Sequence, residues 1–512
     1  MSDWSSGYVA DIGYSFGYCP DLNPLRLKLA FLNAGLDFPS VHTACELGFG
    51  QGISVNVHAA ASTSQWFATD FNPSHARFAQ RLAKASGAKA QLFDQAFADF
   101  CRRDDLPDFD YIGLHGIWSW ISDENRQVIV DFIGKKLKVG GVLCISYNSM
   151  PGWAAMVPMR DLLTEHAEVM GVSGQGIVSR IDGALGFAER LLATNPGYRV
   201  ANPQVTDRLE RLKGHKRNYL AHEYFNRDWA PMSFARMAKW LAPTKASFAC
   251  SAHFLDHLAT LNLSVKQQAL LNEIPDPMFR QTVNDFCVNQ QFRRDYWVKG
   301  PSRLAGPALG EALGSQRIML VQPRAEVSLK VNGPQGEATM EGRVYEPFLD
   351  FLADFQPRTL IQIEAGIRSK NVTFSQILQA TIALIGTGAV APVQDELDIA
   401  GCRGQTQKLN AFLCDMARSG TEVSTLASPV TGGGVSASRI SQLFLHARNL
   451  GKSQPAEWAD FVWRIMSAQK QMLLREGKPL ASAEDNLAEL NSLGDTFAKK
   501  HLPLFQALGV AD

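Results

Sequence analysis

A glycine-rich run, Glu46-Leu47-Gly48-Phe49-Gly50-Gln51-Gly52, is the first group of residues whose types and spacing indicate chemistry. It follows a short apolar stretch typical of a strand and precedes a stretch with helical periodicity, which is the context that a nucleotide-binding loop requires. Glycines allow the backbone to approach a ligand closely and allow a helix to begin beside it. Taken alone, the run could equally be an ordinary turn between a strand and a helix.

Carboxylates follow the next two strands in order. Asp70 ends the strand Gln65–Thr69, about 20 residues after the loop, where a carboxylate can accept hydrogen bonds from two ribose hydroxyls. Asp94 ends the strand Ala90–Phe93, where it could meet the exocyclic amine of adenine. Singly, each acid could be a helix cap or a loop residue. Because ligands bind at the carboxyl ends of the strands in open α/β sheets, the ordered series favours a nucleoside-containing cofactor.

The spacing of the glycines distinguishes between cofactors. Dinucleotide sites use the form GxGxxG, in which a pyrophosphate rests on the start of a helix. The form here, acid-x-Gly-x-Gly-x-Gly, resembles class I methyltransferases, which bind S-adenosyl-L-methionine, a cofactor without phosphate. The resemblance assigns the following residues to the cofactor: Glu46, Gly48, Phe49, Gly50, Gly52, Asp70, Phe71, Asp94, Gln95, Leu114 and His115.

Methyl transfer requires mainly alignment, because the sulfonium of the cofactor is already activated. An acceptor lysine, with a reference pKa of about 10.4, must lose a proton first. Trp118 and Trp120 could equally be ordinary helix–sheet core, and His115 could have a structural role near the cofactor. The candidate catalytic residues are Tyr14, His115, Tyr147 and Asn148, and the candidate substrate residues are Tyr18, Trp118 and Trp120.

The elements that must position these residues alternate between strand-like and helix-like runs over the first 150 residues, which predicts a parallel α/β sheet. The expected strands are Thr43–Glu46, Gln65–Thr69, Ala90–Phe93, Tyr111–Leu114 and Gly141–Tyr147. The expected helices are Ile53–Ala61, Ser74–Ser86 and Asp123–Leu137. Pro73 and the pair Gly140-Gly141 supply start and stop signals for these helices.

The remainder of the chain is mostly helical. Residues 154–219 show helical spacing, and the helix Phe234–Ala242 is followed by a strand, Ala246–Ala252, that could return to complete the sheet. Further on, two helices and a strand follow in a winged-helix-like order: Tyr345–Phe355, Phe374–Ile385 and Ala389–Val393. The run Gly432-Gly433-Gly434 is predicted to be a flexible turn, and Pro455–Val510 closes the chain with helical periodicity.

Four further blocks carry a resemblance, and the first two of them are more selective than the glycine loop. The segments Leu114–Trp120, Ser146–Trp153, His222–Tyr224 and Asp285–Arg294 resemble bacterial methyltransferases with a methyltransferase regulatory domain, of which the rickettsial outer-membrane-protein lysine methyltransferases are the best-known members. The resemblance implies a Rossmann-like catalytic domain, a helical insertion that can dimerise, a middle domain and a C-terminal winged-helix-like domain. It also implies methylation of protein lysines, through a few members. The expected boundaries are 1–150 (catalytic), 151–220 (insertion), 221–262 (return to the sheet and start of the regulatory region), 263–335 (middle) and 336–512 (C-terminal).

Composition narrows the function classes. Lys+Arg and Asp+Glu are both 50, so no net field attracts the chain to nucleic acid or anionic membrane. The start of the chain lacks the layout of a signal peptide, no segment is predicted to span a membrane, and the scattered cysteines favour a reducing cytoplasm. No metal site is expected from the spacing of histidines and cysteines. Three hypotheses stay open: a protein-lysine methyltransferase, a methyltransferase for a small-molecule or surface-glycan amine, and a non-catalytic regulator.

Overall fold

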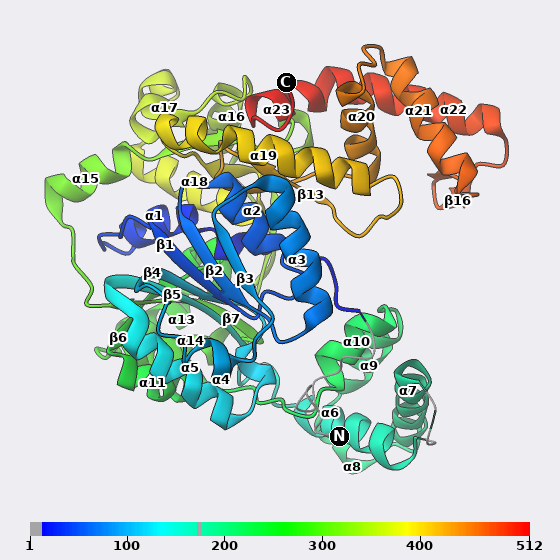
Figure 1. Ribbon diagram of the computed structural model, residues 1–512. Coiled ribbons are helices and arrows are strands. Elements are labelled where there is room, and N and C mark those ends of the chain that lie inside the picture. Colours follow the sequence, from blue (N-terminus) through cyan, green and yellow to red (C-terminus); the bar gives the residue numbers. More distant parts are fainter. Residues whose placement is uncertain (1–12, 172–173, 175) are drawn as a thin grey trace.

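A seven-stranded sheet forms the centre of the computed structural model, which describes residues 13–171, 174 and 176–512 (Figure 1). The strand order is β3-β2-β1-β4-β5-β7-β6, in which β7 runs antiparallel to both of its neighbours and the other pairs are parallel. The strands are β1 (Thr43–Leu47), β2 (Gln65–Thr69), β3 (Ala90–Phe93), β4 (Phe109–Leu114), β5 (Leu137–Asn148), β6 (Ala246–Ser251) and β7 (Phe292–Lys299).

The first five strands and the helices between them confirm the predicted α/β alternation. The helices are α2 (Ile53–Ala61), α3 (Pro73–Ser86) and α5 (Asp123–Lys136), with the short α4 (Phe97–Phe100) before β4. Local chemistry explains the bounds of α3. Asn72 caps its start by accepting from the Ser74 backbone, and Gly87 ends it with a φ of 68°. The Rossmann-like class of the central domain is therefore confirmed.

The sheet is completed by two strands from beyond residue 240. The predicted return strand is β6, at the edge, and α11 (Phe234–Leu241) precedes it. β7 was not predicted, because Arg293, Arg294 and Asp295 make its sequence too polar for a buried strand. In the folded chain Arg293 Nε lies 3.0 Å from Asp295 Oδ2, and this pairing permits both to be buried. The boundary expected at residue 263 thus does not separate this strand from the sheet.

The predicted helical segment lies to one side of the sheet, at the lower right of Figure 1. One face of α7 is buried through Ile181, Leu185 and Ala188, as their spacing predicts. Trp153 and several apolar side chains of the neighbouring helices complete this separate core. The helices are α6 (Val157–Val169), α7 (Ile177–Ala193), α8 (Gly197–Ala201), α9 (Gln204–Lys213) and α10 (Arg217–Tyr224).

The C-terminal half contains the predicted order of helix, helix and strand as α16 (Gly342–Phe351), α18 (Phe374–Thr387) and β12 (Val390–Pro392). The structure adds α17 (Leu360–Gly366) between the two helices. It also adds a three-stranded sheet, β11-β8-β12. The winged-helix character of this C-terminal region stays a prediction.

The other elements that follow α11 are α12 (Ala259–Asn262), α13 (Val265–Asn272), α14 (Pro277–Val288), α15 (Gly306–Gly314), β8 (Arg317–Leu320), β9 (Lys330–Gly333), β10 (Gly336–Thr339), β11 (Arg358–Thr359), α19 (Glu396–Met416), β13 (Thr425–Ser428), β14 (Gly433–Ser436), α20 (Arg439–Asn449), α21 (Pro455–Ala468), β15 (Leu474–Arg475), β16 (Lys478–Pro479), α22 (Ala483–Thr496) and α23 (Leu502–Ala507).

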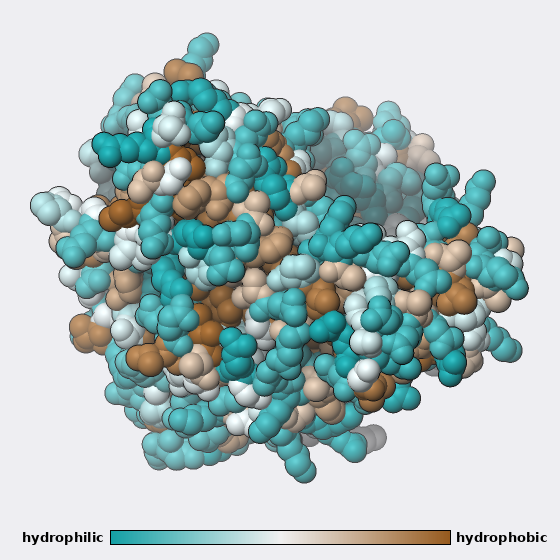
Figure 2. All heavy atoms as spheres, turned by 90° about the horizontal axis from the view of Figure 1, so that it is seen from above, coloured by the Kyte–Doolittle hydropathy of each residue, from teal (hydrophilic) through white to brown (hydrophobic). Residues whose placement is uncertain are grey.

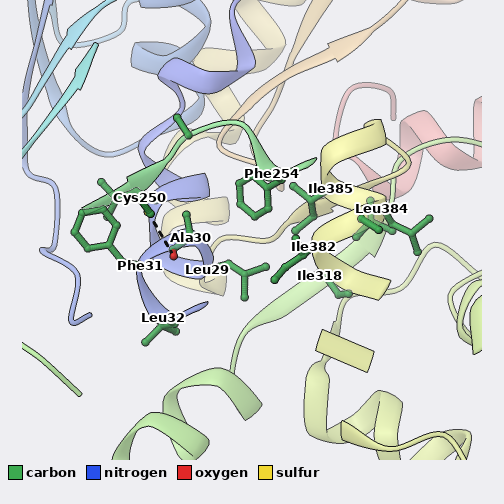
Figure 3. Close-up of a cluster of buried hydrophobic side chains, with 14 of the residues drawn as sticks. Leu29, Ala30, Phe31, Leu32, Cys250, Phe254, Ile318, Ile382, Leu384 and Ile385 are labelled. Atoms are coloured by element: carbon green, nitrogen blue, oxygen red, sulfur yellow. Dashed lines mark hydrogen bonds between the residues drawn. The ribbon is translucent and has the colours of Figure 1, made fainter. Parts of the chain in front are cut away.

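The C-terminal half shares its core with the sheet. Figure 3 shows Phe31 of α1 (Pro24–Asn33) and Cys250 of β6 in one apolar cluster with Ile382 and Ile385 of α18. A second cluster joins α2 and α3 to α19 and the helices after it. The face seen in Figure 2 is largely hydrophilic, with scattered apolar patches. Among the described residues, no helix is both long and apolar enough to cross a membrane.

The glycine run at 432–434 is largely buried in a hairpin, and of its three residues only Gly432 lies in the predicted turn. Gly433 and Gly434 belong to β14, which pairs with β13 and lies against the N-terminal segment. A Cβ atom on Gly433 would lie 2.5 Å from Tyr18 Oη and 2.6 Å from Asn23 Nδ2. Asn23 also donates from Nδ2 to the Thr431 carbonyl, at 3.1 Å. Glycine is required here because the two segments approach too closely for any side chain.

A substitution at Gly433 tests this close approach. Gly433→Ala is expected to lower the free energy of unfolding by about 1–3 kcal/mol, because overpacking forces buried neighbours apart. Gly404→Ala is the control, since Gly404 lies exposed in α19 with no atom within 4 Å of an added Cβ. The control should gain roughly 0.5–1 kcal/mol from helix propensity. Equal denaturation midpoints for Gly433→Ala and wild type would contradict the packing described.

Candidate active site

A cavity of about 600 Å³ lies at the carboxyl ends of β1, β2, β3 and β4, where an open α/β sheet places its ligands. The N-terminal segment and the stretch after α10 close its sides. Most of the residues predicted for the site meet here. Those that line the cavity are Tyr14, Tyr18, Glu46, Gly48, Phe49, Gly50, Asp70, Phe71, Gln95, His115 and Trp120.

The glycine loop joins β1 to α2 with three residues in the left-handed region. The φ angles of Gly48, Gly50 and Gly52 are 77°, 56° and 74°. Space is also limited: a Cβ on Gly48 would lie 2.4 Å from Ile117 Cδ1, and one on Gly52 would lie 2.4 Å from Ala79 Cβ. Gly48 and Gly50 therefore keep backbone against the cavity, whereas Gly52 allows α3 to pack closely behind the loop.

Asp70 connects the end of β2 to this loop. Its Oδ2 accepts from the Gly50 amide at 2.8 Å, and its Oδ1 accepts from the Asn72 amide at 3.0 Å. His75 Nδ1 lies 3.2 Å from the same Oδ1. An ionised carboxylate has about four acceptor positions, so these contacts leave one for a ligand. Asp70 thus shapes the loop and still presents an acceptor to the cavity that it lines.

Glu46 is a buried acid in the wall of the cavity. Its residue surface is 4% exposed, and its Oε2 has no hydrogen-bond partner among the described residues. Burial, with a smaller contribution from the charge of Asp70, raises the pKa of Glu46 to about 8. A carboxyl group held in this way gains interaction energy when a cationic group binds beside it. The arrangement therefore favours a ligand with an amino group.

His115 follows β4 and lines the opposite wall. Burial lowers its pKa to about 4, so the imidazole is neutral at pH 7. Its ring lies edge-on to Phe292 with the centroids 5.8 Å apart. The next residue, Gly116, donates its amide to Ser146 Oγ at 2.8 Å, which ties the turn to β5. This side chain can accept a hydrogen bond from a ligand but is a weak base.

Two tyrosines of the N-terminal segment cover the cavity. Tyr14 lies over the glycine loop, with its Cδ1 3.3 Å from a Cβ built on Gly50, and its ring meets His222 of α10 edge-on at 4.9 Å. Tyr18 Oη forms a hydrogen bond with His58 Nε2 at 3.0 Å, and burial lowers the pKa of His58 to about 3, which keeps that ring neutral. Tyr14 therefore closes the cofactor side, whereas the Tyr18 hydroxyl is already occupied.

Three candidate residues, Trp118 after β4 and Tyr147 and Asn148 on β5, do not line the cavity. Tyr147 is 1% exposed and donates its hydroxyl to Asp295 Oδ2 at 2.9 Å. Trp118 is fully buried, and its indole N–H donates to Met232 Sδ at 3.2 Å. Asn148 is 5% exposed, and its Nδ2 has no hydrogen-bond partner among the described residues. Trp118 therefore has the core position that the sequence left as its alternative, and the Tyr147 hydroxyl is bound to β7.

Three other predicted cofactor residues also lie outside the cavity lining. Of the two predicted residues after β3, Gln95 lines the cavity, whereas Asp94 is exposed and does not. Gly52 packs on Ala79, as described, and Leu114 is fully buried in the sheet.

Sequence reasoning missed several charged residues at the mouth. Glu124 lies in the first turn of α5, and Asp228 with Arg227 follows the block His222–Tyr224. No local pattern marks Arg227 and Asp228, because they reach the cavity only through the return of the chain after the helical insertion. With Glu46 and Asp70, four carboxyl groups line the cavity against one guanidinium. Among the residues described, no cluster of histidine, cysteine or acid could hold a metal ion.

The raised pKa of Glu46 has a consequence for stability. The folded chain binds this proton with a pKa of about 8, against about 4.3 for an unfolded glutamate, so stability falls as pH rises between these values. Glu46→Gln removes this loss. The variant is expected to be more stable, by an amount that grows from about pH 5 to pH 8 to the order of a few kcal/mol.

Thermal or denaturant unfolding from pH 5 to pH 9 measures this difference. Glu311→Gln, at an exposed position on α15, is the matched control and should show no such growth with pH. Parallel stability curves for wild type and Glu46→Gln would show that Glu46 is ionised at neutral pH in the folded chain.

Comparison with known proteins places the chain in a family. Residues 216–299 match the family described as a predicted methyltransferase regulatory domain. The protein sll1526 of Synechocystis sp. is 38% identical over 513 residues, which cover 99% of this chain and 100% of that protein. The protein RP789 of Rickettsia prowazekii is 25% identical over 53% of this chain and 49% of its own length.

A solved structure has the same fold along nearly the whole chain. PKMT2 from Rickettsia typhi, in complex with AdoHcy, covers 96% of this chain and 99% of its own, with a TM-score of 0.67 and 15% sequence identity. At that identity the likeness concerns the fold. The glycine loop, the sheet order and the matched regulatory region all agree with this fold. The chain therefore belongs to the class I S-adenosylmethionine-dependent methyltransferases that carry a methyltransferase regulatory domain, and sll1526 is its relative along the whole length.

Proposed function

We propose that this methyltransferase acts on the amino group of protein lysine side chains. The observation that carries the proposal is the acidic mouth of the cavity, where Glu124 and Asp228 stand beside Arg227 and no other lysine or arginine of the described residues lines the cavity. An acidic cavity with low-dielectric walls attracts a cationic amine and disfavours an anionic acceptor. The similar rickettsial protein was solved in complex with AdoHcy, which supports the same cofactor class here.

The residues present fit the cofactor. The unpaired carboxyl of Glu46 suits its amino group, the free acceptor position of Asp70 suits the ribose hydroxyls, and Gln95 with Phe71 lies where the adenine end would be held. When bound, S-adenosylmethionine supplies a methyl group on a sulfonium that is already activated for transfer. The glycine loop lets the backbone approach, because neither Gly48 nor Gly50 places a side chain against the cavity.

The chain's own contribution is alignment and exclusion of water. Tyr14 covers the loop and contacts His222 of α10, so the helical insertion and the N-terminal segment close the same side of the cavity. A closed site holds the acceptor in line and removes competing solvent. We assign this covering role to Tyr14 in place of proton transfer, since burial raises the pKa of its phenol far above the usual range.

An acceptor lysine must approach as the free amine. The carboxyl groups at the mouth attract the ammonium, and the mouth residues Glu124 and Asp228 remain in contact with solvent that can take the proton. Inside the cavity the neutral ring of His115 then accepts a hydrogen bond from the amine and orients its lone pair. His115 is in this view a positioning group, because a base with a pKa of about 4 holds a proton poorly at pH 7.

A small-molecule or surface-glycan amine is the second candidate acceptor. A cavity of about 600 Å³ falls within the range of small-molecule sites, roughly 300–1,000 Å³. The same carboxyl groups would attract such an amine. The two candidates differ in the size of the methylated product, which an experiment can measure directly.

Calorimetry with S-adenosylhomocysteine tests the cofactor site. Gly50→Arg places a long side chain against Tyr14 at the centre of the loop and is expected to weaken binding at least a hundredfold. Gly87→Arg is the matched control, since Gly87 has a similar φ of 68° but is exposed with open space around it. Equal affinities of wild type and Gly50→Arg would refute the cofactor assignment.

Transfer of a labelled methyl group into fractionated lysate identifies the acceptor class. Incubation with methyl-labelled S-adenosylmethionine should label macromolecular protein, and hydrolysis should release the label as methylated lysine. Gly87→Arg should retain this labelling and Gly50→Arg should lose it. Label confined to the low-mass fraction, with the same dependence on Gly50, would refute protein methylation and favour the small-molecule acceptor.

A further inference from the structure

A second cavity, of about 530 Å³, lies between the N-terminal segment and the C-terminal half. Tyr18 lines both this cavity and the first, so its ring forms part of the wall between them. Asn23 and Arg26 contribute from α1 and its cap, and β14, α20 and α23 contribute from the C-terminal half. Nothing in the proposed methyl transfer uses this space.

The cavity contains a buried cation with an open position. The Arg26 side chain is 12% exposed, and its Nε has no hydrogen-bond partner among the described residues. Its Nη2 lies 3.6 Å from Asp21 Oδ1, but Asp21 also receives Arg294 Nη1 at 3.0 Å. Both guanidinium groups thus approach the same buried carboxylate, and Arg26 is held at the longer distance, by its single ion pair among the described residues. A buried guanidinium with so few partners gains interaction energy when an anion joins it.

The other ionisable side chains of the lining are not paired with Arg26. Glu326 lies 3.6 Å from His501 Nε2, and both side chains are partly exposed, at 43% and 31%. They therefore lie nearer the solvent than Arg26 does. Arg26 is therefore the cation available to a ligand in the buried part of the second cavity.

Two hydrogen-bonding features favour an anion beside Arg26. Thr431, 4% exposed, lines the cavity, and its Oγ1 has no partner among the described residues although its carbonyl accepts from Asn23. The N-terminus of α20, an eleven-residue helix, also lines the cavity, through Ser438 and Ser441. A helix N-terminus favours negative charge, and the unpaired Thr431 hydroxyl can donate to it.

The rest of the cavity wall is apolar. Phe444, Phe497 and Phe505 line it, with Phe497 between the other two at centroid distances of 5.4 and 5.9 Å. These rings are almost completely buried within the C-terminal half. They offer a surface for an apolar or aromatic body, while Arg26 and Thr431 offer a position for a charged end.

We propose that the second cavity binds an organic anion, with a carboxylate or phosphate group at Arg26 and Thr431 and an apolar body against the three phenylalanines. The cationic group at this site contrasts with the acidic lining of the first cavity, so the two cavities bind ligands of opposite charge. The proposal goes beyond the methyl transfer proposed above and does not depend on it.

Calorimetry on the full chain tests the proposal with three probes of similar size. 4-Phenylbutyrate and phenethyl phosphate carry the two anionic groups, and 4-phenylbutanol is the neutral control. At least one anion is expected to bind tenfold or more tightly than the alcohol, because charge-assisted hydrogen bonds to a buried guanidinium are strong. A preference for the carboxylate probe or for the phosphate probe indicates which of these two groups the natural ligand carries. Equal affinity for all three, or no anion binding at millimolar concentration, overturns the proposal.

Variants locate the anion. Arg26→Gln and the isosteric Thr431→Val should each weaken binding of the preferred anion, Arg26→Gln by about tenfold or more. Arg464→Gln, an exposed arginine on α21, is the control and should leave it unchanged. Anion binding that neither variant weakens overturns the proposal. Binding of S-adenosylhomocysteine is measured separately, so failure of the cofactor site and failure of the anion site give different results.

Discussion

The hydrogen bond from Tyr18 Oη to His58 Nε2 ties together the three parts of the molecule that form the site. His58 belongs to α2, which begins directly after the glycine loop, and Tyr18 belongs to the segment that covers the cavity. Gly433 and Gly434 bring the C-terminal hairpin against the same phenol ring. Because both partners are buried and neutral, the bond does not respond to ordinary changes of pH. The bond thus connects the helix after the glycine loop, the covering segment and the wall between the two cavities.

A buried ionic cluster connects β5, β7 and α14. Arg293 contacts both Asp285 and Asp295, and Asp295 accepts from Tyr147 of β5. Tyr147 and Arg293 face each other in the β5–β7 register, and the guanidinium lies 4.5 Å from the Phe234 ring. The blocks that made the family recognisable at 146–153 and 285–294 therefore meet, and much of their chemistry is structural. The contacts between these two blocks hold β7 in its place between β5 and β6.

Much of the site followed from the sequence, because strand ends and glycine spacing are local. β2 and β3 match their predicted ranges, and the loop, Asp70 and Gln95 line one cavity as expected of the carboxyl edge. The sequence predicts both Asp94 and Gln95 for the site, and Gln95 lines the cavity whereas Asp94 is exposed. Which of two neighbouring residues faces a cavity depends on how the chain leaves β3, and the local pattern does not determine this.

Longer-range partners explain the remaining errors. The polar sequence of β7 is buried only because Arg293 finds two acids, one of them on α14. The sequence alone predicts a flexible turn at 432–434, because the partners of this run, Tyr18 and Asn23, lie more than 400 residues earlier. Trp118 and Tyr147 lie next to site residues in the sequence, but their side chains are buried in the core. Local patterns contain no information on these contacts.

The contact between Asn23 and Thr431 joins positions 408 residues apart. During synthesis the covering segment, α1 and β6 leave the ribosome before α18 does, and α18 leaves before the hairpin. Until α18 has been made, α1 and β6 lack the apolar face on which they pack in Figure 3. Contacts of such separation slow folding, because the loop must close before the contact stabilises anything. Folding of the catalytic half therefore passes through states with exposed apolar surface, which are prone to aggregation.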